Sequence, residues 1–374
     1  MPKATNSERS QVWEKTMQGW NENPEIVHAH AHSKIKIQVG HEVRSQEFEW
    51  TPNPDATRGY SGGNRRIVEP QDQYRSCFEK DRDRILHSSS FRRLAGKTQV
   101  FVFPADHQRT RLTHALEVAQ VSRAISKRLG LNVDLSEAIA LGHDCGHGPG
   151  GHASEDALSL FLPDGYDHAV FGADSTLTHL NLCEETLDGI RNHSWSRPEP
   201  ATPEGLVVSW ADRIAYCAHD LEDAINAHIL GQCDVPHKIT RVVGTTRSEQ
   251  LNYFINSIVF TAVKTGYIAM DEEGATALGA MRQFNYESIY LRPESIRQSE
   301  QVIEVLRALV TKLISDRQLF SNLIKDRGVI SFDSPDYDHK VVGYVAGMTD
   351  RYAFSMASSL TEITAEQVPR GIDF

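Results

Sequence analysis

The sequence predicts an all-α fold, in which a bundle of amphipathic helices follows a small N-terminal extension that is irregular or forms a β-hairpin. From about residue 68 onward, apolar residues recur at helical spacing, and prolines such as Pro236 and Pro293 separate the successive stretches. The sequence contains no internal repeat. We therefore expect one helical core over residues 67–374 and an extension with a linker over residues 1–66.

The extension contains His28, His30 and His32 in alternation, followed by alternating apolar residues up to Val39. This period of two is typical of a short strand or hairpin. Three imidazoles on one side of a strand could bind a metal, but no carboxylate or cysteine shares their spacing, and we do not expect a site there. A partner or effector contact within residues 28–50 stays open.

The first helix of chemical interest is expected over residues 111–129. Its apolar residues recur at helical spacing, and Gly130 directly after them is a typical helix stop. His114 lies near the start of this helix. Taken alone, it is more typical of a half-buried structural histidine than of a metal ligand.

His143 and Asp144 directly follow the apolar run of residues 138–141. Imidazole nitrogen and carboxylate oxygen together suit divalent cations. Two packed helices that carry His114 and this His-Asp pair could share one ion. Nearby glycines would let the backbone approach a phosphate closely; they are Gly146, Gly148, Gly150 and Gly151.

Further ligands are offered by residues 205–228, whose apolar residues form a stripe at helical periodicity. Asp212, Tyr216 and Asp220 are spaced four residues apart, so all three could line one wall of a cleft. A solvated acidic face would give the same pattern. Toward the C-terminus, residues 295–320 are expected to form one long helix.

Three motifs occur in order along the chain: Arg111-x-x-His114, His143-Asp144-x-Gly146-His147-Gly148-Pro149-x-x-His152, and Asp212-Arg213-x-x-Tyr216-x-x-x-Asp220. In this order they resemble the HD-domain deoxynucleoside triphosphate triphosphohydrolases, the dGTPase-like enzymes. Residues 91–101, 180–190 and 346–353 also look like segments of that family, so the resemblance covers most of the chain. Such a series is far more specific than a single His-Asp pair.

The resemblance implies an HD-domain helical bundle and metal-dependent hydrolysis of dGTP or of several deoxynucleoside triphosphates (dNTPs). In that reaction water attacks the α-phosphorus and releases the deoxynucleoside and inorganic triphosphate. The implied protein ligands of the metal are His114, His143, Asp144 and Asp212. Two histidines and two carboxylates accept Mn²⁺, Mg²⁺, Fe²⁺, Co²⁺ or Zn²⁺, so the identity of the ion stays open.

The resemblance also assigns substrate contacts. It implies that Arg111 and Arg213 hold the triphosphate, because planar guanidinium groups pair two oxygens at once. Gln99, Tyr216 and Asp220 would face the deoxyribose, with the phenol leaving little space for a 2'-hydroxyl.

Proton transfer falls by resemblance to the pair His152 and Glu155, while His147 would help to stabilise charge on the α-phosphoryl group. Glu155 also lies where a helix is expected to begin, so a capping role is the alternative for it. Residues 167–169 and 171–177 depart from the family pattern, and the preferred base is therefore left open.

Related enzymes form homo-oligomers, often hexamers and sometimes with an allosteric nucleotide between subunits, so we expect self-association.

The net charge of −11 argues against broad nucleic-acid affinity. Basic residues could still contact phosphates of the substrate, of an effector nucleotide or of single-stranded DNA; they are Arg65, Arg66, Arg75, Lys80, Arg82, Arg84, Arg92, Arg93 and Lys97. Ion pairing with Glu79, Asp81 and Asp83 is the alternative, and we favour it for residues 80–84.

A cytoplasmic protein is expected, without a membrane span, because no apolar run approaches the roughly 18 residues of a membrane helix and the N-terminus lacks the apolar region of a secretory signal. The 5 cysteines are widely spaced and should be reduced.

Two other functions stay open. One is a different HD-type phosphohydrolase, acting on nucleoside monophosphates, cyclic dinucleotides or nucleic-acid ends; the other is a non-catalytic dNTP sensor that changes its oligomeric state.

Overall fold

The computed structural model describes residues 20–23, 26–28, 52–59, 63–102, 108–325 and 336–371. The chain divides into two units between Ser45 and Gln46. The boundary that the sequence suggests between residues 66 and 67 stays a prediction.

The first unit contains an antiparallel hairpin of β1 (Trp20–Asn23) and β2 (Ile26–His28), in which Trp20 pairs with His28. A β-hairpin in the N-terminal extension is therefore confirmed, but it ends at His28, where the alternating segment that predicted it begins. His28 ends the second strand, whereas His30, His32 and residues up to Val39 lie outside the described part of the chain.

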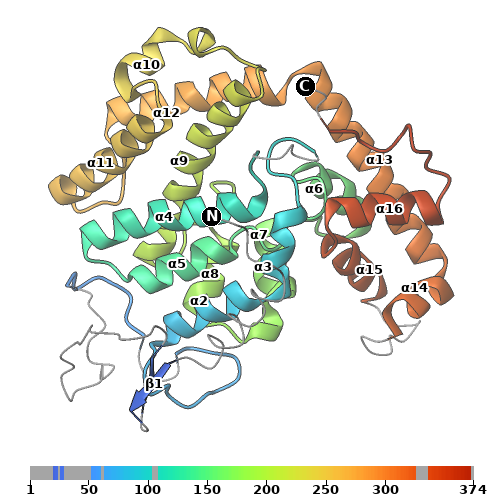
Figure 1. Cartoon of the computed structure of the whole chain (residues 1–374), viewed down its shortest axis with the longest axis horizontal. Coiled ribbons are helices and arrows are strands. Elements are labelled where there is room, and N and C mark those ends of the chain that lie inside the picture. Colours follow the sequence, from blue (N-terminus) through green and yellow to red (C-terminus); the bar gives the residue numbers. More distant parts are fainter. Residues whose placement is uncertain are drawn as a thin grey trace. The chain divides into compact units, whose positions relative to one another are not determined.

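The second unit is built of helices, which confirms the predicted fold class. Its centre is formed by α4 (Arg111–Leu129), α5 (Val133–Gly142) and α9 (Pro203–Asn226), which pack against one another (Figure 1). On α5 lie α2 (Cys77–His87) and α8 (Glu184–Arg191). The apolar faces of these helices meet in one core, where side chains such as Val118, Ile125, Ile139, Val207 and Ile214 are fully buried.

Local capping sets the ends of α4 and α9, the two helices that carry half of the predicted site residues. The backbone N–H of Thr110 donates to Thr113 Oγ1 at 3.1 Å, and α4 ends at Gly130, whose φ of 70° is the left-handed conformation that glycine tolerates. The hydroxyl of Thr202 accepts from Gly205 N at 3.1 Å and Pro203 follows it, which starts α9. Both predicted helices are present within about two residues of their expected ends.

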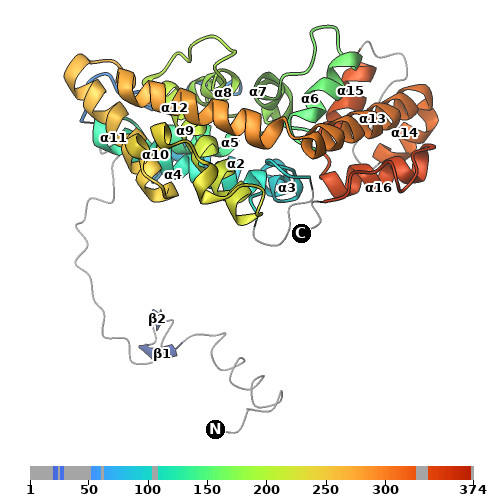
Figure 2. The same cartoon turned by 90° about the horizontal axis from the view of Figure 1, so that it is seen from above.

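Two further groups of helices flank this centre (Figures 1 and 2). One consists of α10 (His237–Val243), α11 (Arg247–Thr265) and α12 (Glu272–Asn285). The other consists of α13 (Pro293–Ser315), α14 (Arg317–Ile324), α15 (Tyr337–Ala346) and α16 (Asp350–Leu360). This C-terminal group has its own apolar core, which includes residues of α6 (Ala153–Leu158).

Short elements connect these helices. They are α3 (Ser89–Arg93), η2 (Leu94–Gly96), η3 (Ser159–Phe161), α7 (His168–Phe171), the π-helix η4 (Gly172–Thr176), η5 (Thr178–Leu180), η6 (Gln232–Asp234) and the π-helix η7 (Tyr286–Tyr290). In the described residues, no helix is at once long enough and apolar enough to span a bilayer.

The single helix predicted over residues 295–320 is wrong at its C-terminal end. Asp316 leaves the helical conformation at φ −107° and ψ 75°, and its side chain accepts from Leu319 N at 3.1 Å. This residue therefore ends α13 and caps α14, since a short carboxylate competes well for the free N–H groups of a helix start.

Asp350 joins the C-terminal group to the central helices. Its carboxylate accepts from Thr98 N at 2.9 Å, from Thr98 Oγ1 at 2.5 Å and from Gly150 N at 2.9 Å. The residue is 2% exposed, so these bonds form away from water. The Asp350 clamp thereby fixes the loop that follows the His-Asp motif against α16.

Gly146 offers a test of how closely the backbone packs around the His143-Asp144 motif. A Cβ there would overlap the carbonyl oxygen of His168 and lie 2.5 Å from Gly172 N, whereas a Cβ at Gly279 in α12 would meet nothing within 4 Å. We predict that Gly146→Ala lowers the free energy of unfolding by about 3 kcal/mol, because two backbone segments must separate. The matched control Gly279→Ala should raise it by about 0.5–1 kcal/mol through helix propensity. Equal denaturant midpoints for the two variants would contradict this packing.

Candidate active site

A cavity of about 450 Å³ opens beside the first turn of α4, the middle of α9 and the segment from η7 into α13. This volume is typical of small-molecule sites. Ten of the twelve site residues predicted from the sequence line it: Gln99, Arg111, His114, Asp144, His147, His152, Asp212, Arg213, Tyr216 and Asp220. The other two, His143 and Glu155, contact lining residues from outside the wall.

The structure brings the predicted metal ligands together. His114 Nε2 lies 3.0 Å from Asp212 Oδ1, and His143 Nε2 lies 3.6 Å from the same oxygen. His143 Nε2 is also 3.5 Å from Asp144 Oδ1. One candidate ligand atom from each of His114, His143 and Asp212 falls within a 4.8 Å span. One donor group each from α4, from the residue directly after α5 and from α9 therefore meets at a common point.

His143 shows that this donor set fits a cation. Its Nδ1 lies 2.6 Å from the carbonyl oxygen of Ala140, which can only accept, so Nδ1 carries the proton and donates. Its Nε2 is buried without a hydrogen-bond partner among the described residues and lies near two carboxylates. An imidazole oriented by a backbone carbonyl, with its second nitrogen facing acidic oxygens, has the arrangement of a metal-ligating histidine.

Asp144 is held in its ionised form by a guanidinium group on one carboxylate oxygen and an imidazole at the other. Its Oδ2 accepts from Arg111 Nη1 at 2.8 Å and its Oδ1 lies 3.1 Å from His147 Nε2. Burial opposes ionisation, but Arg111 and His143 hold the pKa of Asp144 well below its usual range. For His143, burial lowers the pKa while Asp144 and Asp212 act against it, and the result is a pKa raised to about 9.

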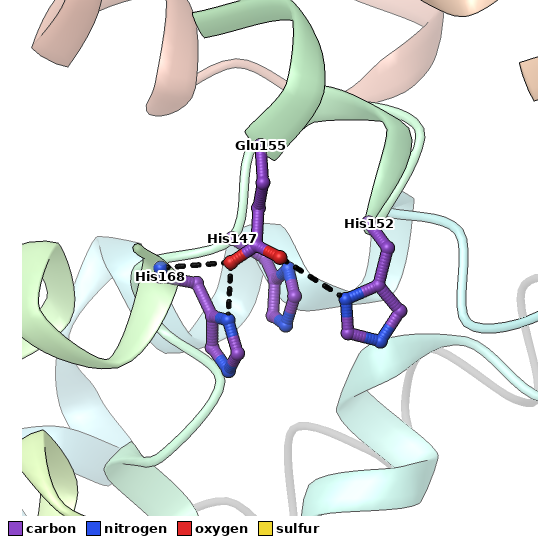
Figure 3. A group of neighbouring side chains, drawn as sticks. All are labelled: His147, His152, Glu155 and His168. Carbon is purple, nitrogen blue, oxygen red and sulfur yellow. Dashed lines mark hydrogen bonds and ion pairs between the residues drawn. The ribbon is translucent and has the colours of Figure 1, made fainter. Parts of the chain in front are cut away.

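Glu155 lies between His152 and His168 (Figure 3). Its Oε2 is 3.3 Å from His152 Nδ1, and its Oε1 is 2.6 Å from His168 Nδ1 and 2.9 Å from His168 N. Burial opposes its ionisation, yet hydrogen bonds from His152 and His168 lower the pKa of Glu155. Its side chain thus orients two imidazoles, and it also lies in the first turn of α6, where an acidic side chain is favourable. The side chain of His152 is 75% exposed, so its ring reaches the open cavity.

His168 and His193 belong to this cluster and were missed by the sequence analysis. His168 stacks on His147 with ring centroids 3.7 Å apart, and its Nε2 lies 3.3 Å from His193 Nε2. His193 is fixed by donation from its Nδ1 to Ile190 O at 2.8 Å. His147, His152, Glu155 and His168 form a second group that could hold a metal, and His143, Asp144 and His193 form a third. The sequence offered one signal for His193, because this residue lies three positions after the segment 180–190 that resembles the family.

The residues predicted to contact the sugar line the same cavity as this cluster. Tyr216 accepts from Arg282 Nε at 3.2 Å. Tyr290 donates to Asp220, a contact that the sequence did not reveal because the two residues are 70 positions apart. Arg213 stacks on Trp195, with the guanidinium carbon 3.5 Å from the ring centroid.

Several buried polar atoms in the cavity have no hydrogen-bond partner among the described residues. They are Gln99 Oε1, Arg111 Nε and Nη2, Arg213 Nε and Asp220 Oδ1. Buried donors and acceptors are rarely left unpaired in folded proteins, so this pattern indicates a polar ligand.

Comparison with known proteins agrees with this geometry. Residues 111–217 match the HD domain and residues 268–359 match the phosphohydrolase-associated domain. A deoxyguanosinetriphosphate triphosphohydrolase-like protein of Caldanaerobacter subterraneus is 37% identical over 315 residues, which cover 80% of this chain and 89% of the relative. Proteins described in the same words from Clostridium perfringens strain 13 and Clostridium tetani are 40% and 35% identical, and the matches cover 78% and 82% of this chain.

The fold and the His/Asp site define an HD-domain phosphohydrolase with a candidate divalent-metal centre. More narrowly, the chain belongs to the deoxyguanosinetriphosphate triphosphohydrolase-like family, as the resemblance predicted.

Asp220 gives the cavity a testable pH dependence. Burial raises the pKa of this carboxyl to about 7, although the hydrogen bond from Tyr290 acts in the opposite direction. The unfolded chain loses this proton near pH 4 and the folded protein near pH 7, so the stability that the protonated group contributes is lost as pH rises between these values. We predict that the Tm of Asp220→Asn minus that of the wild type increases from pH 4 to pH 7 and is constant above. A difference that does not vary with pH would contradict the raised pKa.

Proposed function

We propose that this protein hydrolyses dNTPs, either dGTP or several of them, to the deoxynucleoside and inorganic triphosphate, with water attacking the α-phosphorus. The proposal rests on a single cavity whose lining contains three of the four candidate metal ligands and the residues predicted to contact the sugar. His114, His143 and Asp212 converge at one point, with Asp144 beside His143. Tyr216 and Asp220 of α9 line the same cavity. The printed names of the relatives point to dGTP.

The metal would be held by His114, His143, Asp144 and Asp212. A bound divalent cation would polarise the α-phosphoryl oxygen as a Lewis acid. This donor set accepts Mn²⁺, Mg²⁺, Fe²⁺, Co²⁺ and Zn²⁺.

Arg111 and Arg213 would bind the triphosphate. Both carry buried guanidinium nitrogens without partners among the described residues. Arg111 also contacts Asp144, so the same side chain links phosphate binding to the metal centre. Lysine could not replace either residue fully, because a planar guanidinium pairs two oxygens in a fixed geometry.

Proton transfer would involve His152. Glu155 occupies its Nδ1 side, which leaves Nε2 to accept a proton from water or to donate one to the leaving 5'-oxygen. His147 is buried beside Asp144 and would contribute to stabilising charge on the α-phosphoryl group. Gln99, Tyr216 and Asp220 would hold the deoxyribose. The expected homo-oligomer, the effector nucleotide and the cytoplasmic location are parts of the same proposal.

Product analysis tests the reaction. We predict that the purified chain, incubated with each dNTP singly and in mixtures over a panel of the five metals, releases deoxynucleoside and triphosphate in equal amounts. Chromatography with phosphate-specific detection separates the products. Orthophosphate or pyrophosphate as the primary product would indicate a different HD-type phosphohydrolase. Saturable dNTP binding without turnover under every condition would indicate a sensor.

The proton-transfer pair is tested by substitution. We predict that His152→Ala and Glu155→Gln each reduce kcat by about 10²–10⁴-fold, the usual contribution of a general acid or base. Metal content and the Kd for a non-hydrolysable dNTP should change little, because neither side chain is assigned to binding. His237→Ala, an exposed histidine at the start of α10, is the matched control and should retain full turnover. Full activity of both variants with metal bound would exclude this assignment.

A further inference from the structure

A second, smaller cavity of about 210 Å³ lies between α3, η4 and α15. Its wall includes Ser89, Ser90, Arg93, Lys97, Thr176 and His179. We call it the polar cavity. It shares no lining residue with the candidate active site, and among the described residues that line it none carries a carboxylate.

Lys97 is the most unusual residue of this wall. Its side chain is buried with the residue 3% exposed, and its ammonium group donates to Ala346 O at 2.8 Å and to His147 O. Within the described parts of the chain, no carboxylate oxygen lies within ion-pair distance of this group. Burial lowers the pKa of Lys97 to about 7, although Asp350 acts to raise it. An anion bound beside this buried amine would raise its pKa again and keep it in the charged ammonium form.

Arg93 places a second cation on the same wall. Its guanidinium donates to Ser89 O at 3.1 Å, to Ser89 Oγ at 3.0 Å and to Gly347 O at 2.9 Å. These bonds fix the orientation of the group between α3 and the end of α15. Around it, the hydroxyls of Ser90 and Thr176 and the imidazole of His179 add donors of the kind that phosphate oxygens accept.

We propose that the polar cavity binds a small phosphate-type oxyanion through Arg93, Lys97 and the surrounding hydroxyls. Two cations and several neutral donors, with no carboxylate in the described lining, favour an anion over a cation or an apolar ligand. The ligand is inorganic phosphate or the phosphoryl group of a small nucleotide, since both present the same oxygens. This site is separate from the proposed dNTP site and does not depend on it.

Occupancy would act on the candidate active site through Lys97. The same ammonium group contacts the carbonyl of His147 in the His-Asp loop and the carbonyl of Ala346 in α15. Cys145, directly after Asp144, also lines the polar cavity. An anion bound here therefore strengthens the junction between the C-terminal helices and the loop that carries the catalytic candidates.

The test uses the full chain in a phosphate-free buffer, with inorganic phosphate as the probe in calorimetry and thermal unfolding. We expect saturable binding and a rise in Tm of roughly 1–3 °C at ten times the Kd. Arg93→Gln should weaken binding at least tenfold. Arg92→Gln removes the same charge from the neighbouring exposed residue and should bind as the wild type does. Arg213→Gln, in the candidate active site, should also keep this binding.

Thr176→Glu provides a second test if Arg93→Gln folds poorly, because a carboxylate in the wall should abolish phosphate binding while pairing with the lysine. A deoxynucleoside monophosphate is the second ligand. Tighter binding of this nucleotide, lost in the same variants, would identify a nucleotide phosphoryl group as the ligand, and equal or weaker binding would identify free phosphate. Three outcomes would overturn the proposal. Phosphate binding could be lost in Arg213→Gln alone, or Arg92→Gln and Arg93→Gln could have equal effects. The third is that neither probe binds at 10 mM, which is roughly the weakest range of specific recognition.

Discussion

The presence of two carboxylates, the buried Asp144 and the half-buried Asp212, is the constraint on which the site depends. A buried carboxylate costs several kcal/mol unless cations and hydrogen bonds compensate it. Arg111 and His147 compensate Asp144, and His114 and His143 compensate Asp212. Arg111 and His114 lie on α4, His143 and His147 follow α5, and Asp212 lies on α9, so the three-helix packing and the charge balance of the site require each other. The position between the two carboxylates is where a divalent cation would complete the balance.

Much of the fold could be predicted because the relevant signals are local. The apolar period and Gly130 determine α4, and a threonine followed by proline determines the start of α9. The candidate ligands could be found because their motifs occur in a recognisable order. The break at Asp316 was missed for a physical reason: the apolar period continues across it, whereas a single side-chain cap ends one helix and starts the next.

The rest of the site depends on contacts between segments that are far apart in the sequence. His168 reaches Glu155 because α7 folds back beside α6, and Tyr290 reaches Asp220 from a π-helix. Nothing in the neighbours of these residues indicates such partners, since an isolated histidine or tyrosine is usually structural. The roles of the individual residues stay predictions, because geometry brings groups together without showing which of them moves a proton.

The Asp350 clamp has a consequence for dynamics. One carboxylate saturates amide donors of two separate loops, at Thr98 and Gly150, and sits at the first turn of the last long helix. Local opening of α16 would leave these buried donors unpaired, which is costly. The helix and both loops should therefore open as one cooperative unit rather than by fraying from the C-terminal side. Motion of α16 is therefore coupled, through Asp350, to the rigidity of the loop beside His147.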